Sequence, residues 1–407
     1  MKLRKVLLGF LAMALFFSIL SGASMSLFNN DWEDTNLVNL DSVIQDKKER
    51  KAYSISEMIL SGEEALIFGT KDKEYSGPVR LDQPSQIYFL SSQDSRINFL
   101  MSLDDNKQYT FGKHSNTVGD VIYATVNSRT LNQENQNMET ALYKVKVPNG
   151  QFEELSIPEE ADNIRLTPVF TNQEHGFLFP ERRSVFFETQ DGGRSWKVRH
   201  LPPGYARLKG SDRSRSGNIT IQHETGDLFL SGHYREDDEK PSSSPIYRLP
   251  ADNDDTQGWQ EVTQLERYDI NAMTFLDNGD LLILAFEGDR PEEGNDHRQA
   301  QILRWDGKDF EHLADLGNRE LFDPRTNTNL SPNFFVSGRN GLVVLNGKSF
   351  KNEQGDLPVY NVSYVSHDYG KNWERIDNGI ANGPVWFDKS SGYLYKATPF
   401  SFYRKRL

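Results

Sequence analysis

Short apolar runs, each preceded by a glycine, recur along most of the chain. The runs at 65–68, 121–123 and 281–284 contain three or four consecutive apolar residues. Runs of this length, bounded by turn residues, are typical of buried β-strands. The glycines are 50 to 62 residues apart, which is room for about four short strands per repeat. They are Gly62, Gly119, Gly176, Gly226, Gly279, Gly341 and Gly392.

A second series of turns falls between these glycines and marks a further hairpin in each repeat. Each turn is rich in Asp, Asn or Gly and leads to an aromatic residue and a polar strand. They lie at 92–99, 148–152, 189–196, 254–259, 305–310 and 366–373. Repeats of four short strands with this spacing predict an all-β fold, a seven-bladed β-propeller of four-stranded blades.

Two of these turns share one pattern, Ser/Thr-x-Asp-x-Gly-x-(Ser/Asn)-Trp. The first octet, residues 189–196, reads Thr-Gln-Asp-Gly-Gly-Arg-Ser-Trp, and the second, residues 366–373, reads Ser-His-Asp-Tyr-Gly-Lys-Asn-Trp. This pattern resembles the Asp-box, or BNR repeat, of sialidases, sortilin-type receptors and photosystem II assembly factors. The resemblance implies a propeller and structural roles for six residues, and it implies no particular activity. These residues are Asp191, Gly193 and Trp196, and Asp368, Gly370 and Trp373.

The two chain ends are predicted to complete one blade together. There are seven glycine turns but six of the second turns, and the chain ends after what reads as the third strand of its last repeat, 400–404. Near the N-terminus, Trp32-Glu33 matches the Trp373 that ends the second octet and the Glu374 that follows it, and it precedes a further strand. We therefore expect residues 24–407 to form one domain whose ring closes by pairing the N-terminal strand with the C-terminal blade. A six-bladed ring is the alternative.

The first 23 residues have the pattern of a signal peptide. Lys2, Arg4 and Lys5 precede an apolar run at 6–20, and small residues follow at 21–23. The run is shorter than the ~20 residues that a spanning helix needs, although an uncleaved membrane anchor is the alternative. Both predict a periplasmic or secreted protein, or one anchored in the inner membrane and facing the periplasm. The absence of cysteine excludes a lipoprotein anchor and disulfides.

The formal net charge of −13 makes nucleic acid and anionic membrane surfaces poor partners. Membrane contact is expected only through the N-terminal segment. A protein with a basic patch, bound by a monomeric chain, is the expected partner.

Recognition is expected at the polar segments that should join the second and third strands of a blade. Four are too long for plain turns, at 128–140, 233–245, 287–300 and 347–358. Solvated decoration is the alternative for such charged segments. The candidate partner-binding residues are Arg165, Arg207, Arg213, Arg215, Glu236, Asp237, Asp238, Glu292 and Glu293.

Catalytic signatures are weak. A sialidase-like site would need an Arg-Ile-Pro segment, and the nearest sequence is Arg165-Leu166-Thr167-Pro168. There is no thiol nucleophile, no Gly-x-Ser-x-Gly elbow and no paired-histidine metal spacing. A stretch at 252–258 resembles a calcium loop, but its position favours a degenerate octet. We therefore expect no catalytic residue, metal or cofactor.

Two functions remain open. The first is a non-enzymatic exported protein that binds another protein, a class that includes immunity proteins and assembly factors. The second is a carbohydrate-active enzyme or glycan-binding propeller.

Overall fold

The computed structural model describes the protein in segments. The described residues are 33–34, 53–61, 64–71, 86–91, 96–104, 107–111, 116–130, 138–147, 150–161, 164–180, 183–202, 219–222, 224–231, 243–251, 258–287, 300–315, 330–349, 360–376, 385–388, 392–397 and 402–407.

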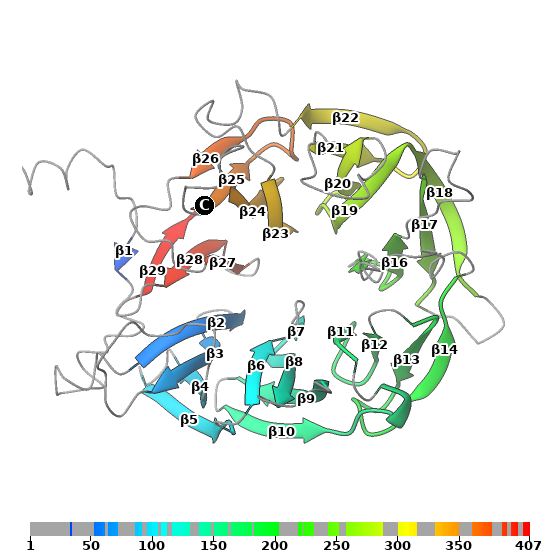
Figure 1. The fold of residues 1–407 in the computed structure, drawn as a ribbon. Coiled ribbons are helices and arrows are strands. Elements are labelled where there is room, and N and C mark those ends of the chain that lie inside the picture. Colours follow the sequence, from blue (N-terminus) through cyan, green and yellow to red (C-terminus); the bar gives the residue numbers. More distant parts are fainter. Residues whose placement is uncertain are drawn as a thin grey trace, which may run out of the picture.

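The chain is an all-β propeller of four-stranded antiparallel blades, one of which has its innermost strand divided into β6 and β7, both paired with β8 (Figure 1). Within the described residues, six sheets are each built from consecutive strands. The first three sheets contain β2 (Tyr53–Ser61), β3 (Glu64–Lys71), β4 (Gln86–Ser91) and β5 (Arg96–Ser102); β6 (Lys107–Phe111), β7 (Asn116–Val118), β8 (Val121–Thr130), β9 (Met138–Lys146) and β10 (Gln151–Leu155); and β11 (Leu166–Phe170), β12 (Gly176–Pro180), β13 (Val185–Thr189) and β14 (Lys197–His200). A 3₁₀ turn, η2 (Glu159–Ala161), lies between the second and third of these sheets.

The next three sheets follow the same plan. They contain β15 (Ile219–Ile221), β16 (Leu228–Ser231), β17 (Ser243–Leu249) and β18 (Gln260–Glu266); β19 (Tyr268–Phe275), β20 (Leu281–Glu287), β21 (Ala300–Trp305) and β22 (Phe310–Asp315); and β23 (Leu330–Ser337), β24 (Val343–Ser349), β25 (Tyr360–Ser366) and β26 (Glu374–Ile376).

A further sheet joins the two ends of the chain. It contains β27 (Val385–Asp388), β28 (Tyr393–Ala397), β29 (Phe402–Arg406) and β1 (Glu33–Asp34). Strand β1 pairs with β29 in antiparallel register, with Glu33 opposite Arg404 and Asp34 opposite Tyr403. The last blade-like sheet is therefore composite.

The sheets are arranged in a ring, with one edge strand of each sheet, such as β11, nearest the centre and the opposite edge strand, such as β14, at the rim (Figure 1). Their packing faces form apolar clusters between neighbouring sheets, as between β12 and β16, where Phe179 packs with Leu228 and Leu230. The core is thus distributed around the ring.

The glycines of the repeat occupy the turns between first and second strands, and most have a positive φ, as in Gly279 at 89°. Gly176 differs because it is the first residue of β12 and has no positive φ. A Cβ at Gly176 would lie 2.3 Å from the ring of Phe170, which stacks on Tyr123 with ring centroids 3.6 Å apart. Glycine is needed there for the close approach of an aromatic ring.

Candidate functional site

Arg165 is the predicted partner-binding residue that lies within the described residues. It directly precedes β11, the inner strand of its sheet, and its side chain is partly buried. The carbonyl of Ile164 accepts a hydrogen bond from the Thr140 hydroxyl at 2.8 Å. The carbonyl of Leu166 accepts one from the Thr125 hydroxyl at 3.0 Å. Both threonines belong to the preceding sheet, so the backbone on either side of Arg165 is held from outside its own blade.

The other predicted binding residues lie outside the described residues. Arg207, Arg213 and Arg215 belong to the connection between β14 and β15. Glu236, Asp237 and Asp238 belong to the connection between β16 and β17, and Glu292 and Glu293 to that between β20 and β21. The structure places only the ends of these connections.

In the first octet, Asp191 organises the hairpin between β13 and β14. Its Oδ1 accepts hydrogen bonds from the backbone N–H of Arg194 at 3.0 Å and of Ser195 at 2.9 Å. Its Oδ2 accepts one from the Ser195 hydroxyl at 2.6 Å. The Ser195 hydroxyl, with these N–H groups and Thr189, holds the pKa of Asp191 well below its ordinary value. Asp191 is therefore committed to the turn as an ionised acceptor.

Asp368 has the same place in the second octet, between β25 and β26. Its carboxylate accepts hydrogen bonds from the backbone N–H of Asn372 at 2.8 Å and from the Asn372 amide at 2.6 Å. Burial raises the pKa of Asp368, but these donors and the Ser366 hydroxyl outweigh it and lower the pKa. Gly370, with φ of 86°, donates its N–H to the Ser366 hydroxyl at 2.9 Å.

The tryptophans of the two octets have different partners. The indole N–H of Trp196 donates to the carbonyl of Ser156 in the preceding sheet's exit segment, at 2.8 Å. The indole N–H of Trp373 donates to Gly370 in its own turn, at 2.8 Å. Trp259, at the matching place before β18, donates to the carbonyl of His200 at 3.2 Å. The indole hydrogen bond of the first octet therefore joins neighbouring sheets, while that of the second stays within its own turn and Trp373 meets the preceding sheet through apolar packing with Leu282 and Leu284.

Replacing Asp368 by Ala is expected to lower the free energy of unfolding by about 1–3 kcal/mol, because turn N–H groups lose their acceptor. Asp191→Ala should also lower the melting temperature. Asp309→Ala is the matched control, since this exposed aspartate in the turn before β22 contributes to the turn through its backbone N–H and carbonyl, which the substitution keeps. Thermal unfolding of the three variants measures the effect. Loss of partner binding at full stability in either octet variant would instead assign the octets a binding role.

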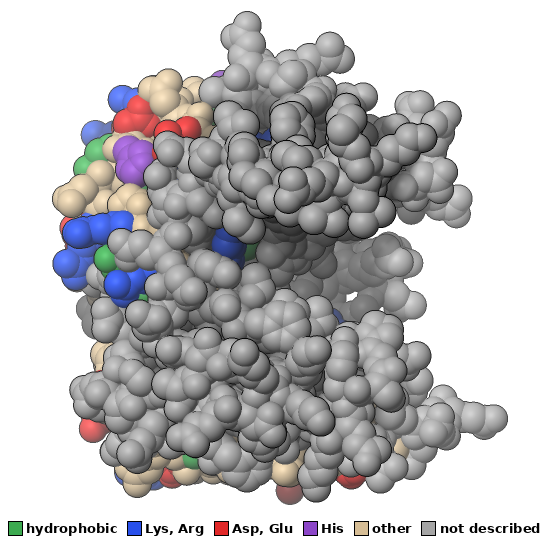
Figure 2. Space-filling view, turned by 90° about the vertical axis from the view of Figure 1, so that its left-hand side faces the viewer, with side chains coloured by type: hydrophobic (Ala, Val, Ile, Leu, Met, Phe, Trp, Pro, Cys, Tyr) green, Lys and Arg blue, Asp and Glu red, His purple; other side chains and the backbone are tan. Residues whose placement is uncertain are grey.

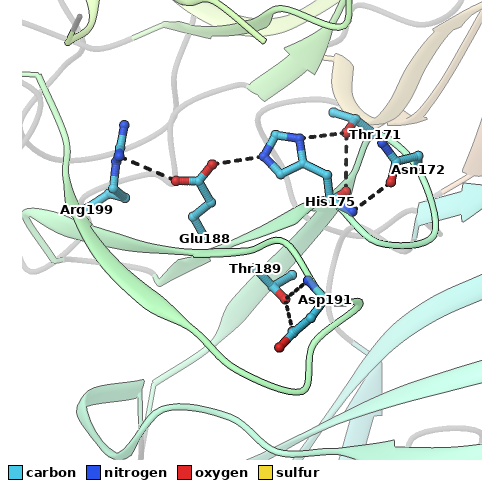
Figure 3. A network of polar contacts seen from close by, with 7 residues as sticks. All are labelled: Thr171, Asn172, His175, Glu188, Thr189, Asp191 and Arg199. Atoms are coloured by element: carbon cyan, nitrogen blue, oxygen red, sulfur yellow. Dashed lines mark hydrogen bonds and ion pairs between the residues drawn. The ribbon is translucent and has the colours of Figure 1, made fainter. Parts of the chain in front are cut away.

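A polar network connects the strands of the β11–β14 sheet, close to the first octet (Figure 3). His175, in the turn between β11 and β12, contacts Glu188 of β13 through Nε2 and Oε1 at 2.9 Å. Glu188 Oε2 lies 3.6 Å from a guanidinium nitrogen of Arg199 on β14. Thr171 Oγ1 lies 3.3 Å from His175 Nδ1. The side chains of Glu188 and Arg199 are only 11% and 13% exposed, so the network is largely withdrawn from water.

An alcohol, an imidazole and a carboxylate in this order resemble an activated nucleophile. The surrounding donors do not support that chemistry. The backbone N–H groups of Thr171 and Asn172 both donate to the carbonyl of His175, at 3.0 and 3.3 Å. The N–H groups beside the hydroxyl are therefore committed to the turn, and neither is available to stabilise an oxyanion.

The same two positions form an ion pair in the next two sheets. His175, Asp227 and Asp280 each directly precede the second strand of a sheet, and their partners each lie opposite the second residue of that strand. Asp227 Oδ2 lies 2.6 Å from Arg248, and Asp280 Oδ2 lies 3.8 Å from Arg304. The His175–Glu188 pair is thus this repeated clamp with the acidic and basic positions exchanged, which assigns it a structural role.

The environment of Glu188 keeps it ionised. The hydrogen bond from His175 is the largest contribution and lowers the pKa of Glu188. Burial opposes this, and the charge of Arg199 lowers the pKa further. The clamp was not predicted from the sequence. Aligning the repeats on their glycine turns would have revealed complementary residues at matching positions.

A second set of polar contacts lies in the β19–β22 sheet, at the end opposite the Asp280–Arg304 pair. The Tyr268 hydroxyl donates to Gln301 Oε1 at 3.0 Å, and Gln301 Nε2 donates to Glu287 Oε2 at 3.0 Å. Burial raises the pKa of Tyr268, and the nearby charges of Glu287 and Asp315 raise it further, so the phenol remains a donor. These side chains stand where the connection at 288–299 leaves the sheet, and they fix its two ends.

No group of three or more metal-ligating side chains occurs in the described part of the chain. No helix among the described residues is long and apolar enough to cross a membrane.

The chain is similar in structure to known propellers. No family model and no curated protein match its sequence. The GH74 xyloglucanase of Xanthomonas campestris superposes with a TM-score of 0.55 at 11% identity, over 88% of this chain and 52% of that enzyme. A GH74 enzyme of Niastella koreensis gives a TM-score of 0.51 at 10% identity, over 87% of this chain and 52% of the enzyme. The chain thus spans about half the length of these enzymes, and the similarity shows the propeller fold.

Proposed function

We propose that this chain is an exported, non-enzymatic, protein-binding β-propeller with seven blades. Two octets of the Asp-box type each stabilise a hairpin in it. The composite sheet of β1 and β27–β29 supports the seventh blade and its closure by the N-terminal strand. Export rests on the sequence of residues 1–23, which lie outside the described residues.

The unequal length of the connections at the two ends of the strands carries the proposal. At one end, the connections from first to second and from third to fourth strand are short, as with 276–280 and 306–309. At the other end, residues 232–242, 288–299 and 350–359 join second to third strands, and 316–329 joins two sheets. A rigid ring that extends long polar segments from one face is the usual arrangement for recognition of a partner.

Charge distinguishes this long-connection face. The segments at 232–242 and 288–299 are rich in Asp and Glu, whereas residues 203–218 carry Arg207, Arg213 and Arg215. Elsewhere, the described surface seen from the side of β1 and β29 shows Lys and Arg gathered beside acidic and His side chains (Figure 2). We propose that the acidic segments attract a partner with a basic patch.

The test is a reversal of charge on each face. Changing Glu236, Asp237, Asp238, Glu292 and Glu293 to Lys is expected to slow association with a purified partner about tenfold or more at low salt, because such charges steer encounter. The effect should shrink as the Debye length falls to ~8 Å near 0.15 M salt. Stopped-flow kinetics or surface plasmon resonance measures the association rate at low salt and near 0.15 M salt.

The matched control reverses five exposed acids elsewhere, with the same change in net charge. They are Glu153, Glu154, Glu174, Glu224 and Asp309. Equal slowing by both sets would show a general charge effect and contradict the proposed face. Binding of xyloglucan-type oligosaccharides by the native protein, lost in neither set, would favour the glycan-directed alternative.

A further inference from the structure

Arg165 stands apart among the cations of the described residues. The residue is partly buried, yet its side chain forms no hydrogen bond, ion pair or ring contact in the described part of the chain. Every other Lys or Arg there whose side chain is described as partly or fully buried has a partner. These are Lys107, Lys144, Arg199, Arg248, Arg304, Lys396, Arg404 and Lys405.

The structure holds Arg165 in place without using its charge. Threonine hydroxyls of the preceding sheet fix the carbonyls of Ile164 and Leu166, at 2.8 and 3.0 Å. Ala161 and Leu166, which flank this short segment, are 0% and 1% exposed. A fixed backbone limits the positions that the guanidinium can reach, and a partly buried arginine without an internal counter-ion has its charge available to another group. Both features favour binding of an external anion.

The position of Arg165 coincides with the proposed recognition face. It is the last residue of the connection that leads into β11. This is the end of the strands from which the long connections leave. Strand β11 is the strand of its sheet that lies nearest the centre of the ring (Figure 1). Glu159 and Glu160 of the nearby 3₁₀ turn are exposed, and neither pairs with Arg165. An anion reaching Arg165 therefore does not have to displace an internal carboxylate.

We propose that Arg165 binds a carboxylate of the protein partner, from an Asp or Glu side chain. The planar guanidinium presents two parallel N–H donors that match the two carboxylate oxygens. This inference rests on the proposed function. The acidic segments attract a basic partner, and Arg165 then selects one acidic side chain within that basic surface. A partner with only basic residues would leave the cation unpaired, so the site adds specificity.

The carboxylate site is tested on the full chain by NMR of its arginine side chains. The probe is N-acetylglutamic acid α-amide, and the control ligand is the neutral N-acetylglutamine α-amide. The Arg165 Nε signal, identified by its loss in Arg165→Lys, should shift saturably with the acid and not with the neutral ligand. The Arg248 signal should not move, because Asp227 already holds this guanidinium. No shift at Arg165, or equal shifts at both arginines, would overturn the proposal.

Two further measurements separate the possible sources of the carboxylate and the two levels of inference. If glucuronate binds at least tenfold more tightly than the glutamate probe, the ligand is a sugar acid and a protein source is wrong. With a purified partner, Arg165→Lys should speed dissociation at least tenfold and leave association unchanged. If the loop reversals have no effect while the glutamate probe still binds at Arg165, the recognition face fails and the carboxylate site stands.

Discussion

Removal of residues 24–42 is expected to lower the free energy of unfolding by several kcal/mol, a large part of the ~5–15 kcal/mol that stabilises a typical protein. This segment carries β1, which pairs Glu33 with Arg404 and Asp34 with Tyr403. Its removal leaves β29 as an unpaired edge and opens the ring. Thermal or urea unfolding of the truncated and untruncated chains measures the loss. An unchanged melting temperature would contradict closure by the N-terminal strand.

A disulfide tests the same closure without relying on stability. Because the chain has no cysteine, the double variant Glu33→Cys/Arg404→Cys contains a single possible bridge. Residues in register on antiparallel strands have neighbouring Cβ atoms, so this pair should oxidise readily. The control Glu33→Cys/Lys405→Cys is offset by one residue and places the thiols on opposite faces. Peptide mapping by mass spectrometry should find the bridge in the first variant only.

The repeat could be predicted from the sequence because its signals are local. A glycine, a short apolar run and an acidic turn act within a few residues, and the strands β16, β20 and β24 follow Gly226, Gly279 and Gly341 as expected. The segments predicted to lie between second and third strands also do so, although β8 extends to Thr130 and shortens the first of them. Gly176 was predicted in the turn, but it is the first residue of β12, where it pairs with Phe170 and leaves room for the Phe170 ring.

Features that depend on contacts between strands or sheets could not be predicted in this way. The sequence of the first octet does not reveal that Trp196 reaches Ser156, 40 residues earlier. The clamp of His175 and Glu188 escaped because its residue types differ from those of Asp227 and Arg248, although the geometry is shared. The unpaired state of Arg165 likewise depends on all its neighbours in space. Local signals therefore specified the repeat, and non-local packing decided the candidate site.

Replacing Glu188 by Ala is expected to lower the free energy of unfolding by about 2–4 kcal/mol at pH 7, because Arg199 and His175 lose their shared acceptor in a mostly buried setting. The free energy of unfolding of this variant should also depend less on pH in the acidic range than that of the native protein. The native environment lowers the pKa of Glu188, so the unfolded chain takes up a proton at a higher pH than the folded chain. The carboxylate therefore stabilises the fold above its unfolded pKa of about 4.3, and this stabilisation is lost as pH falls through the lower folded pKa.

Transplanting the neighbouring clamp distinguishes a structural role from a chemical one. The triple variant His175→Asp/Glu188→Arg/Arg199→Thr gives this sheet the residues that Asp227, Arg248 and Thr263 supply in the next sheet. We expect unfolding at pH 7 within about 1 kcal/mol of the native protein, since the same two positions again hold an ion pair. Glu174→Ala, an exposed acid in the same turn, is the control and should change stability by less than about 0.5 kcal/mol. If the triple variant is stable but no longer binds a partner that the native protein binds, the imidazole and carboxylate have a direct role in recognition, and the structural assignment of this network is wrong.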